Sequence, residues 1–233
     1  NSINVLPANA LNDLMYRVCL DVWTVELFAK LLNFYKFCFV SSNFFSFVGG
    51  GCQNTSCCGG FIGGGRLNVG CGTYSSIGGG ASNTSSGQYS FIGGGSVNIA
   101  LGSISTIGGG RCNFASGATS TIGGGYCNCI TGAGSVIGGG CCNSVSGCTS
   151  FIGAGYCNLS SGNFSFIGGG TGNTVSTCFS SILGGEKNNS STFVHSNIIG
   201  SNITANRACT TFVNDLSVCS FTGSSGCTVG IST

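Results

Sequence analysis

An apolar residue recurs every fifteen residues along most of this chain, and this period constrains the fold more than any other feature. The recurring residues are Ile62, Ile77, Ile92, Ile107, Ile122, Ile137, Ile152, Ile167 and Ile182. Most of them open a unit that reads I-G-G-G-x-x-N-x-x-x-G-x-x-S-x, with departures at Ala154, Thr177 and Leu183, and a degenerate copy, one residue short, begins at Val48. A fixed period of this kind indicates a repeat protein whose units stack on one another.

The spacing within each unit indicates a strand. Ser75 stands two residues before Ile77, so the two share one face of a strand while Tyr74 and Ser76 point the other way. We therefore predict an all-β fold, a parallel β-solenoid of about ten coils with serine and isoleucine inside. The outward positions hold many aromatic residues and threonines, which are too apolar for plain solvent, so we expect something to cover part of this face.

Charge excludes several functions. The formal net charge is +2 over 233 residues, and Arg66 and Arg111 are the only charges between Val48 and Ile182. No basic patch therefore points to nucleic acid, and the repeats lack the carboxylate pair of a glycosidase. His195 and Asp215 with a nearby serine could form a triad, but His195 falls at the serine position where the repeat ends, which favours a structural role. We predict neither an enzyme nor a cofactor.

The glycine triplets allow two interpretations. In the first, they form a smooth stripe along a thin solenoid, which lets three chains approach closely in a homotrimer. In the second, they only make a turn within each coil. The first assigns chain-to-chain contact to residues such as Gly78, Gly79, Gly80, Gly108, Gly109, Gly110, Gly123, Gly124 and Gly125.

Asparagine occupies one position in every unit. We predict that it is a turn residue that tolerates a left-handed backbone, with the side-chain amides of successive coils stacked as a ladder. The predicted ladder contains Asn83, Asn98, Asn113, Asn128, Asn143 and Asn158.

Cysteine recurs in one column at Cys112, Cys127, Cys142 and Cys157. In-register parallel strands would place these residues about 4.8 Å apart, which permits disulfides. The total of 17 cysteines is odd, however, and side chains stacked directly above each other do not have the Cβ separation that a disulfide prefers. We therefore expect small buried thiols. The sequence has no pair of C-x-x-C motifs, which argues against a structural zinc site.

The chain divides into three segments. Residues 1–47 lack the repeat, residues 48–204 form the solenoid and residues 205–233 form a C-terminal transition. The first segment contains either a buried helix from about Leu20 to Phe37 or two strands, and we expect it to cap the solenoid or to attach it. The four charges between Leu20 and Phe37 argue against a membrane span, although an interfacial helix is an alternative.

The pattern S-x-I-G-x-x-x-x-x-x-x-x-G resembles the head repeats of trimeric autotransporter adhesins. With its I-G-G-G and asparagine it is also similar to repeats in the shafts of phage and other viral tail fibres. The resemblance covers about Val48 to Thr204 and is carried by Ser75, Ile77, Gly78, Gly87 and their equivalents. It implies a left-handed parallel β-roll that assembles as a homotrimer and presents a receptor-binding surface. The stretch "HSNIIGSNITANRACTTFVNDLSV" resembles the transition into the C-terminal chaperone domain of tail fibres.

Three functions remain from the sequence. The first is a structural, receptor-binding fibre, located on a virion appendage or an extracellular surface, whose partners are itself and a host glycan or protein. The second is a trimeric cell-surface adhesin or an extracellular filament subunit. The third is an ice-binding solenoid, although the outward columns mix phenylalanine, tyrosine, valine and serine with the threonine that such a surface needs.

Overall fold

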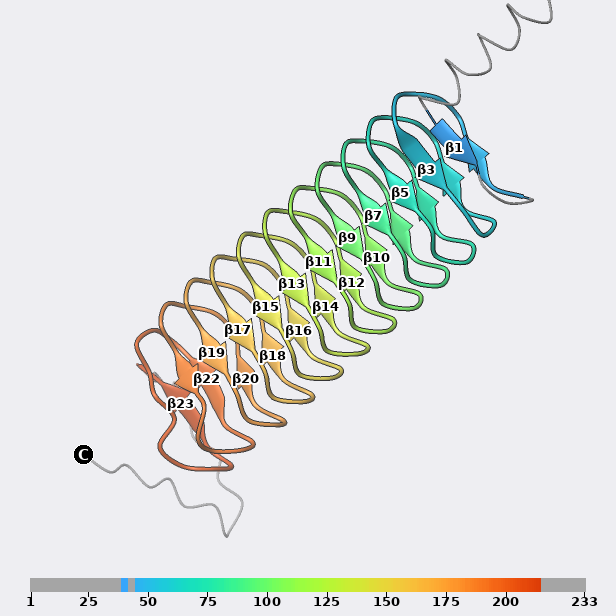
Figure 1. Cartoon of the computed structure of the whole chain (residues 1–233). Helices are drawn as coiled ribbons and strands as arrows, with labels where there is room; N and C mark the ends of the chain where they lie inside the picture. The colour runs from blue at the N-terminus through green and yellow to red at the C-terminus, as the bar shows by residue number, and fades with distance from the viewer. Residues whose placement is uncertain (1–38, 42–44, 215–233) are drawn as a thin grey trace, which may run out of the picture.

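The computed structural model describes residues 39–41 and 45–214, which form a parallel β-solenoid of about eleven coils. Figure 1 shows the coils stacked along one axis as an elongated rod. The described residues contain strands and no helix, which confirms the predicted all-β, parallel architecture. The helix or pair of strands predicted for about residues 20–37 lies outside the described residues.

Each full coil contributes one short strand to each of two sheets. The first sheet has eleven strands: β1 (Phe39–Ser41), β3 (Asn54–Ser56), β5 (Val69–Gly70), β7 (Thr84–Ser85), β9 (Ile99–Ala100), β11 (Phe114–Ala115), β13 (Cys129–Ile130), β15 (Ser144–Val145), β17 (Leu159–Ser160), β19 (Thr174–Val175) and β21 (Asn189–Ser190). The second has twelve: β2 (Phe47–Val48), β4 (Phe61–Ile62), β6 (Ser76–Ile77), β8 (Phe91–Ile92), β10 (Thr106–Ile107), β12 (Thr121–Ile122), β14 (Val136–Ile137), β16 (Phe151–Ile152), β18 (Phe166–Ile167), β20 (Ser181–Ile182), β22 (Asn197–Ile199) and β23 (Thr211–Val213).

The register follows the sequence period. Ile77 pairs with Ile92, fifteen residues away. The first coil is one residue shorter, because Val48 pairs with Ile62, and a later coil is one residue longer, because Ile182 pairs with Ile198. The short copy at Val48 is therefore a genuine first coil. Strands β1 and β23 pair with the same two sheets on either side of residues 48–204.

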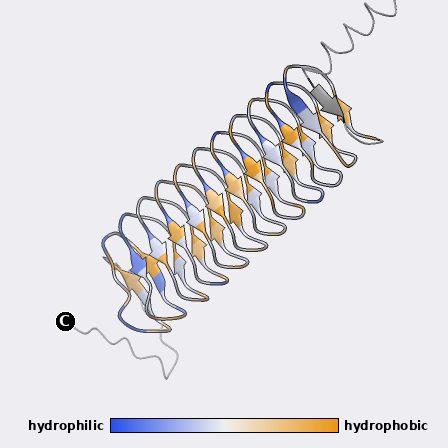
Figure 2. Cartoon of the chain, viewed as in Figure 1, coloured by the Kyte–Doolittle hydropathy of each residue, from blue (hydrophilic) through white to orange (hydrophobic). Residues whose placement is uncertain are grey.

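The core is one side-chain layer thick. The repeating isoleucines are fully buried, and they face a second buried column of more varied residues, such as Ala100, Ala115, Ile130 and Val145. The serine column is buried as predicted; Ser120, for example, donates its hydroxyl to the carbonyl of Gly117 at 2.7 Å. Figure 2 shows the hydrophobic colour concentrated on the stacked strands. Burial of the isoleucine column is the main hydrophobic contribution to stability in each coil.

Left-handed backbone makes the corners of each coil. In the coil after Ile77, positive φ angles occur at Gly80 (93°), Ser82 (56°) and Tyr89 (55°). Equivalent corners recur along the solenoid, so non-glycine residues repeatedly take a conformation that usually favours glycine or asparagine. Successive corners are joined by backbone hydrogen bonds, as from the Val97 N–H to the Ala81 carbonyl at 2.9 Å. Stacking between coils therefore offsets the cost of the left-handed corners.

Candidate functional site

The asparagine column forms the predicted ladder inside the solenoid. The Asn128 amide nitrogen donates to Asn113 Oδ1 at 3.2 Å and to the carbonyls of Gly124 and Gly140 at 3.0 and 2.9 Å. The backbone N–H and the side-chain Nδ2 of Asn143 both donate to Asn128 Oδ1 at 3.1 Å. The same pattern joins Asn83, Asn98, Asn113 and Asn158, and all six predicted ladder residues are buried.

The predicted left-handed conformation of asparagine is wrong. The left-handed corner is the residue before it: Ser82 precedes Asn83 with φ 56°, and Cys127 precedes Asn128 with φ 53°. The ladder needs the amide directed inward, between the carbonyl groups of its own coil and the next. Asparagine is therefore selected by buried hydrogen bonding, since an amide supplies two donor hydrogens and an acceptor.

The first and third glycines of each triplet have a reason within the chain. A Cβ on Gly123 would lie 2.3 Å from the carbonyl oxygen of Gly138 in the next coil. One on Gly125 would lie 2.2 Å from the carbonyl oxygen of Gly140, and Gly125 also has φ +94°. Gly78, Gly80, Gly108 and Gly110 show the same two patterns. These six predicted contact residues therefore serve coil-on-coil packing, which neither interpretation named, and only Gly80, Gly110 and Gly125 also have the positive φ of a turn residue.

The middle glycines differ. A Cβ on Gly109 would have no atom within 4 Å, and the nearest atoms to one on Gly79 or Gly124 are at 3.9 Å. Ala154 occupies this position in one unit. The triplets are half-buried or exposed, so they form a surface edge almost without side chains. Contact between chains along this edge stays a prediction, and the middle glycines are the ones whose identity coil packing does not explain.

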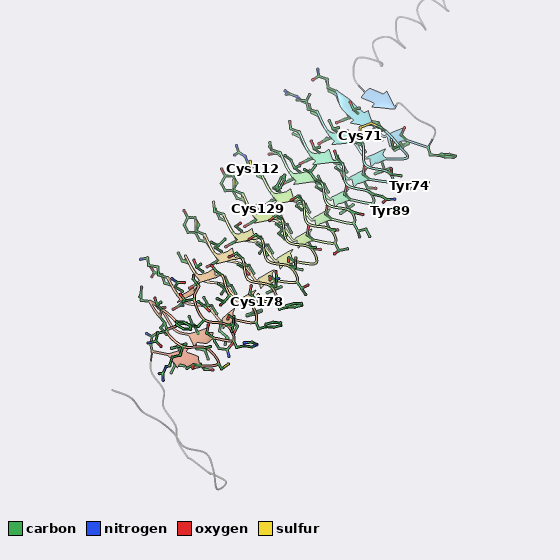
Figure 3. All side chains as sticks on the ribbon, turned by 60° about the horizontal axis from the view of Figure 1, so that its bottom comes forward. Cys71, Tyr74, Tyr89, Cys112, Cys129 and Cys178 are labelled. Atoms are coloured by element: carbon green, nitrogen blue, oxygen red, sulfur yellow. A yellow bond between two sulfur atoms is a disulfide. The ribbon has the colours of Figure 1, made fainter. Side chains whose placement is uncertain are left out.

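The outward columns of the second sheet carry a group of exposed aromatic side chains. One column consists of left-handed corners such as Tyr74 and Tyr89, and the other of outward strand residues such as Phe61 and Phe91. The buried serine column runs between them, and we call the whole surface the aromatic face. Figure 3 shows Tyr74 and Tyr89 projecting together from one edge of the solenoid. The predicted outward direction of these residues is confirmed.

Aromatic residues gather in two patches on the aromatic face. The first patch holds Phe47, Phe61, Tyr74, Tyr89, Phe91 and Ile104, and the second holds Phe151, Phe164, Phe166, Phe179 and His195. Rings stack between neighbouring coils, with centroid separations of 5.3 Å for Phe47 and Phe61, 5.5 Å for Tyr74 and Tyr89, 5.4 Å for Phe151 and Phe166, and 5.1 Å for Phe164 and Phe179. Smaller residues, chiefly threonine, separate the patches.

His195 belongs to the second patch and does not continue the serine column. Its ring stacks on Phe179 with a centroid separation of 5.2 Å, whereas Ser196 is the buried serine paired with Ser180. The extra residue between Ile182 and Ile198 shifts the column by one, which explains the wrong sequence assignment. Asp215, the other residue of the conceivable triad, lies outside the described residues.

A group of cysteines occupies another corner of the solenoid. Cys112, Cys127, Cys142 and Cys157 are left-handed corners with φ of 53–58°, and Cys141 adjoins this column. We call these five residues the thiol edge. The prediction that the column is buried is wrong: Cys142 and Cys157 are exposed, and Cys112 and Cys127 are half-buried. The side chain of a left-handed corner points away from the core, so burial fails although the stacking is as predicted.

The groups of the thiol edge interact with one another. The sulfur atoms of Cys141 and Cys142 are 3.3 Å apart, and hydrogen bonding with Cys141 raises the pKa of Cys142 to about 11. A hydrogen bond with Cys127 raises the pKa of Tyr126, and one with Cys157 raises the pKa of Tyr156. Cys142 therefore remains a thiol at neutral pH.

One disulfide joins Cys57 to Cys71, fourteen residues apart, with a Cα separation of 4.6 Å. Ser56 pairs with Gly70 in the parallel register, so the two cysteines that follow lie side by side on neighbouring coils. The sequence contained the signal, because their spacing equals the length of the short first coil. Within the described ranges, no group of three or more histidine, cysteine or acidic residues is arranged to hold a metal ion.

The described residues contain no helix long and apolar enough to cross a membrane. Comparison of the whole chain with protein-family models finds no match, and comparison with curated proteins finds none either.

Proposed function

We propose that this chain is part of the shaft of a structural, receptor-binding fibre, such as a tail fibre or a similar appendage on a virion or an extracellular surface. The observation that carries the proposal is the unbroken stack of coils, whose outer face displays two patches of exposed aromatic residues. About eleven coils at the spacing of parallel strands give a rod roughly 50 Å long. Continuous hydrogen bonding between coils makes such a rod a stiff scaffold for side chains displayed in rows.

We propose further that the fibre is a homotrimer. The core is one side-chain layer thick, while Tyr74, Ile104, Phe164 and Phe179 are each more than half exposed. Large apolar patches on a soluble surface usually mark an interaction site. Assembly would cover part of the aromatic face or of the glycine edge and leave the remainder for a host glycan or protein.

The proposed role is not enzymatic. The support comes from the sequence, because no aspartate or glutamate stands between Val48 and Ile182 to supply a carboxylate acid or base. The aromatic face consists of stacked rings and hydroxyl groups, which suit recognition of a surface by contact.

A trimeric cell-surface adhesin or an extracellular filament subunit is the second candidate, favoured by the same exposed aromatic patches. An ice-binding solenoid has narrower support, from exposed Thr119 and Thr149 and from Thr106 paired with Thr121 between the patches. A thermal-hysteresis assay separates this last role from the others.

Sedimentation equilibrium of the full chain tests the assembly. One chain has a mass of 23.2 kDa, so a trimer has three times this mass, about 70 kDa. We expect the double variant Phe164→Ser and Phe179→Ser to weaken assembly, and the matched variant Thr119→Ser with Thr149→Ser to leave it intact. A monomer of wild type at micromolar concentration would refute the homotrimer. A glycan array tests the receptor role. We expect the wild-type chain to bind glycans on the array and the Phe164→Ser, Phe179→Ser double variant to lose this binding.

A further inference from the structure

The column of Cys112, Cys127, Cys142 and Cys157 repeats one backbone conformation on four successive coils. The N–H groups of Cys127, Cys142 and Cys157 donate to the carbonyls of Arg111, Tyr126 and Cys141 in the preceding coils, at 2.9, 2.9 and 3.0 Å. The four φ angles lie within 5° of one another, between 53° and 58°. The corners are therefore superimposed along the solenoid, with one cysteine directly next to another.

Their spacing suits a covalent bond between coils. Equivalent Cα atoms of in-register parallel strands lie about 4.8 Å apart, within the 4.4–6.8 Å range of disulfides. The same chain already joins two neighbouring coils in this way, through Cys57 and Cys71 with a Cα separation of 4.6 Å. Cysteines on adjacent coils of this solenoid are thus close enough to pair without a change in register.

The column is also accessible. Cys142 and Cys157 are exposed and Cys112 and Cys127 are half-buried, so a small oxidant in solution can reach the sulfur atoms. Cys129 provides an internal contrast. It pairs with Phe114 on one side and Ser144 on the other, so no cysteine lies next to it in its own column.

We propose that this column is a redox modification site, at which oxidation joins Cys112 to Cys127 and Cys142 to Cys157. This pairing uses all four thiols, whereas a bond between Cys127 and Cys142 would leave Cys112 and Cys157 without an adjacent partner in the column. Each bond would close a loop of about fifteen residues and restrict the unfolded chain. Oxidation would thereby fasten the middle of the solenoid, far along the chain from the Cys57–Cys71 bond.

The chemistry is thiol–disulfide exchange with a small-molecule disulfide such as oxidised glutathione. One cysteine loses its proton and attacks a glutathione sulfur, which forms a mixed disulfide and releases one reduced glutathione. The neighbouring cysteine then loses its proton, attacks the protein sulfur of the mixed disulfide and releases the second glutathione. The two protein thiols are oxidised by two electrons, one glutathione disulfide is reduced to two thiols, and the two protons end on these products.

Cys141 is the competing partner. Its sulfur is 3.3 Å from that of Cys142, so it could attack the same mixed disulfide. The proposed bond to Cys157 and a bond between Cys141 and Cys142 are therefore alternative products, and a test must distinguish them.

Peptide mapping makes this distinction. The full chain is reduced, freed of reductant, held in oxidised glutathione, alkylated and digested with chymotrypsin. Cleavage after Phe114, Tyr126, Phe151 and Tyr156 leaves Cys112 and Cys157 on separate peptides, with Cys127 and Cys142 on the one between. We expect a disulfide-linked complex of all three peptides that reductant separates.

Serine variants assign the bonds. Cys142→Ser should release only the peptide with Cys157, and Cys127→Ser should release only the peptide with Cys112. Cys129→Ser, the matched control, should leave the complex unchanged. Serine is suited to these corners because Ser82 occupies the same position in another coil. We also expect oxidation to raise the denaturant midpoint of wild type by more than that of the Cys127→Ser, Cys142→Ser double variant.

Three results would overturn the proposal. The first is that all four column thiols remain open to alkylation after oxidation. The second is that Cys142 pairs with Cys141 and the Cys157 peptide stays separate. The third is that the linked peptides come from different chains, which a mixture of isotopically labelled and unlabelled protein would show.

Discussion

Replacement of Asn128 by alanine tests whether the asparagine ladder holds the coils together. Alanine removes the only acceptor of the Asn143 N–H, Asn128 Oδ1, at 3.1 Å, and the donor at 3.0 Å from the Gly124 carbonyl. The Gly140 carbonyl keeps a bond from the Tyr126 N–H at 2.9 Å, and Asn113 Oδ1 keeps the bond from the N–H of residue 128 at 3.0 Å. The change therefore leaves one buried N–H and one part-buried carbonyl without partners.

The magnitude follows from these two groups. A buried amide N–H without a partner costs about 1–3 kcal/mol, and the bond to Gly124 contributes about 1 kcal/mol. We expect Asn128→Ala to lower the free energy of unfolding by about 2–4 kcal/mol. Chemical denaturation followed by far-ultraviolet circular dichroism measures this loss.

Asn163 provides the matched control. It is exposed, and its Oδ1 accepts one hydrogen bond, from the Cys148 N–H at 2.9 Å. Water can replace this acceptor, so Asn163→Ala should cost less than about 1 kcal/mol. If Asn128→Ala costs no more than Asn163→Ala, the ladder does not carry the stability that we assign to it.

Asn128→Asp sharpens the test. Aspartate keeps an oxygen for the Asn143 N–H, but it places a carboxylate between two carbonyl oxygens, at Gly124 and Gly140. The buried charge should make this variant less stable than Asn128→Ala at neutral pH. Because protonation removes the charge and restores a donor, its stability should rise as the pH falls. A pH-independent loss would argue against the buried position.

Three further predictions concern other columns. Gly125→Ala should disrupt folding, because Gly125 has φ +94° and its Cβ would lie 2.2 Å from a carbonyl oxygen, whereas Gly124→Ala should stay within about 1 kcal/mol of wild type; circular dichroism and denaturation compare the two. Ile122→Ala should lower the free energy of unfolding by about 2–5 kcal/mol, because its side chain is fully buried, as denaturant titration would show. The rate of Cys142 alkylation by iodoacetamide should rise with pH to a midpoint at its pKa of about 11. Cys141→Ala should lower this midpoint toward 9.0, because it removes the hydrogen bond that raises the pKa.

The repeated strands could be predicted because one signal determines several levels of structure. The spacing of Ser75 and Ile77 places both on one strand face, and a constant period then requires the same residues to stack in every coil. Parallel register, the buried columns and the outward aromatic residues all follow from this pattern. The irregular coils could not be predicted in the same way, since the single extra residue before Ile198 moved His195 into the aromatic row.

The corners were less predictable because stacking overrides local preference. Leu67, Val97 and Cys112 have little intrinsic tendency toward positive φ, yet all three take it. Asparagine has that tendency and stands one residue later, where buried hydrogen bonds require it instead. The intrinsic preference for positive φ therefore pointed to the asparagine, although the residue before it is the left-handed corner. The wrong prediction that the thiol edge is buried has the same cause: these cysteines are corner residues, and a corner side chain points away from the core.

The glycine triplet combines two kinds of constraint. Gly123 and Gly125 are fixed by the carbonyl oxygens of the next coil, so stacking of regular fifteen-residue coils favours glycine there whether or not the chain assembles. Leu183 takes the first position only where the following coil is one residue longer. Gly124 has no such neighbour within 3.8 Å, and Ala154 shows that a methyl group is accommodated at the equivalent position. A preference for glycine at the middle position must therefore come from local backbone freedom or from a surface outside the coil. If a second chain lies against this edge, it would restrict the residue at the middle position. Packing between coils of the same chain already restricts the other two positions.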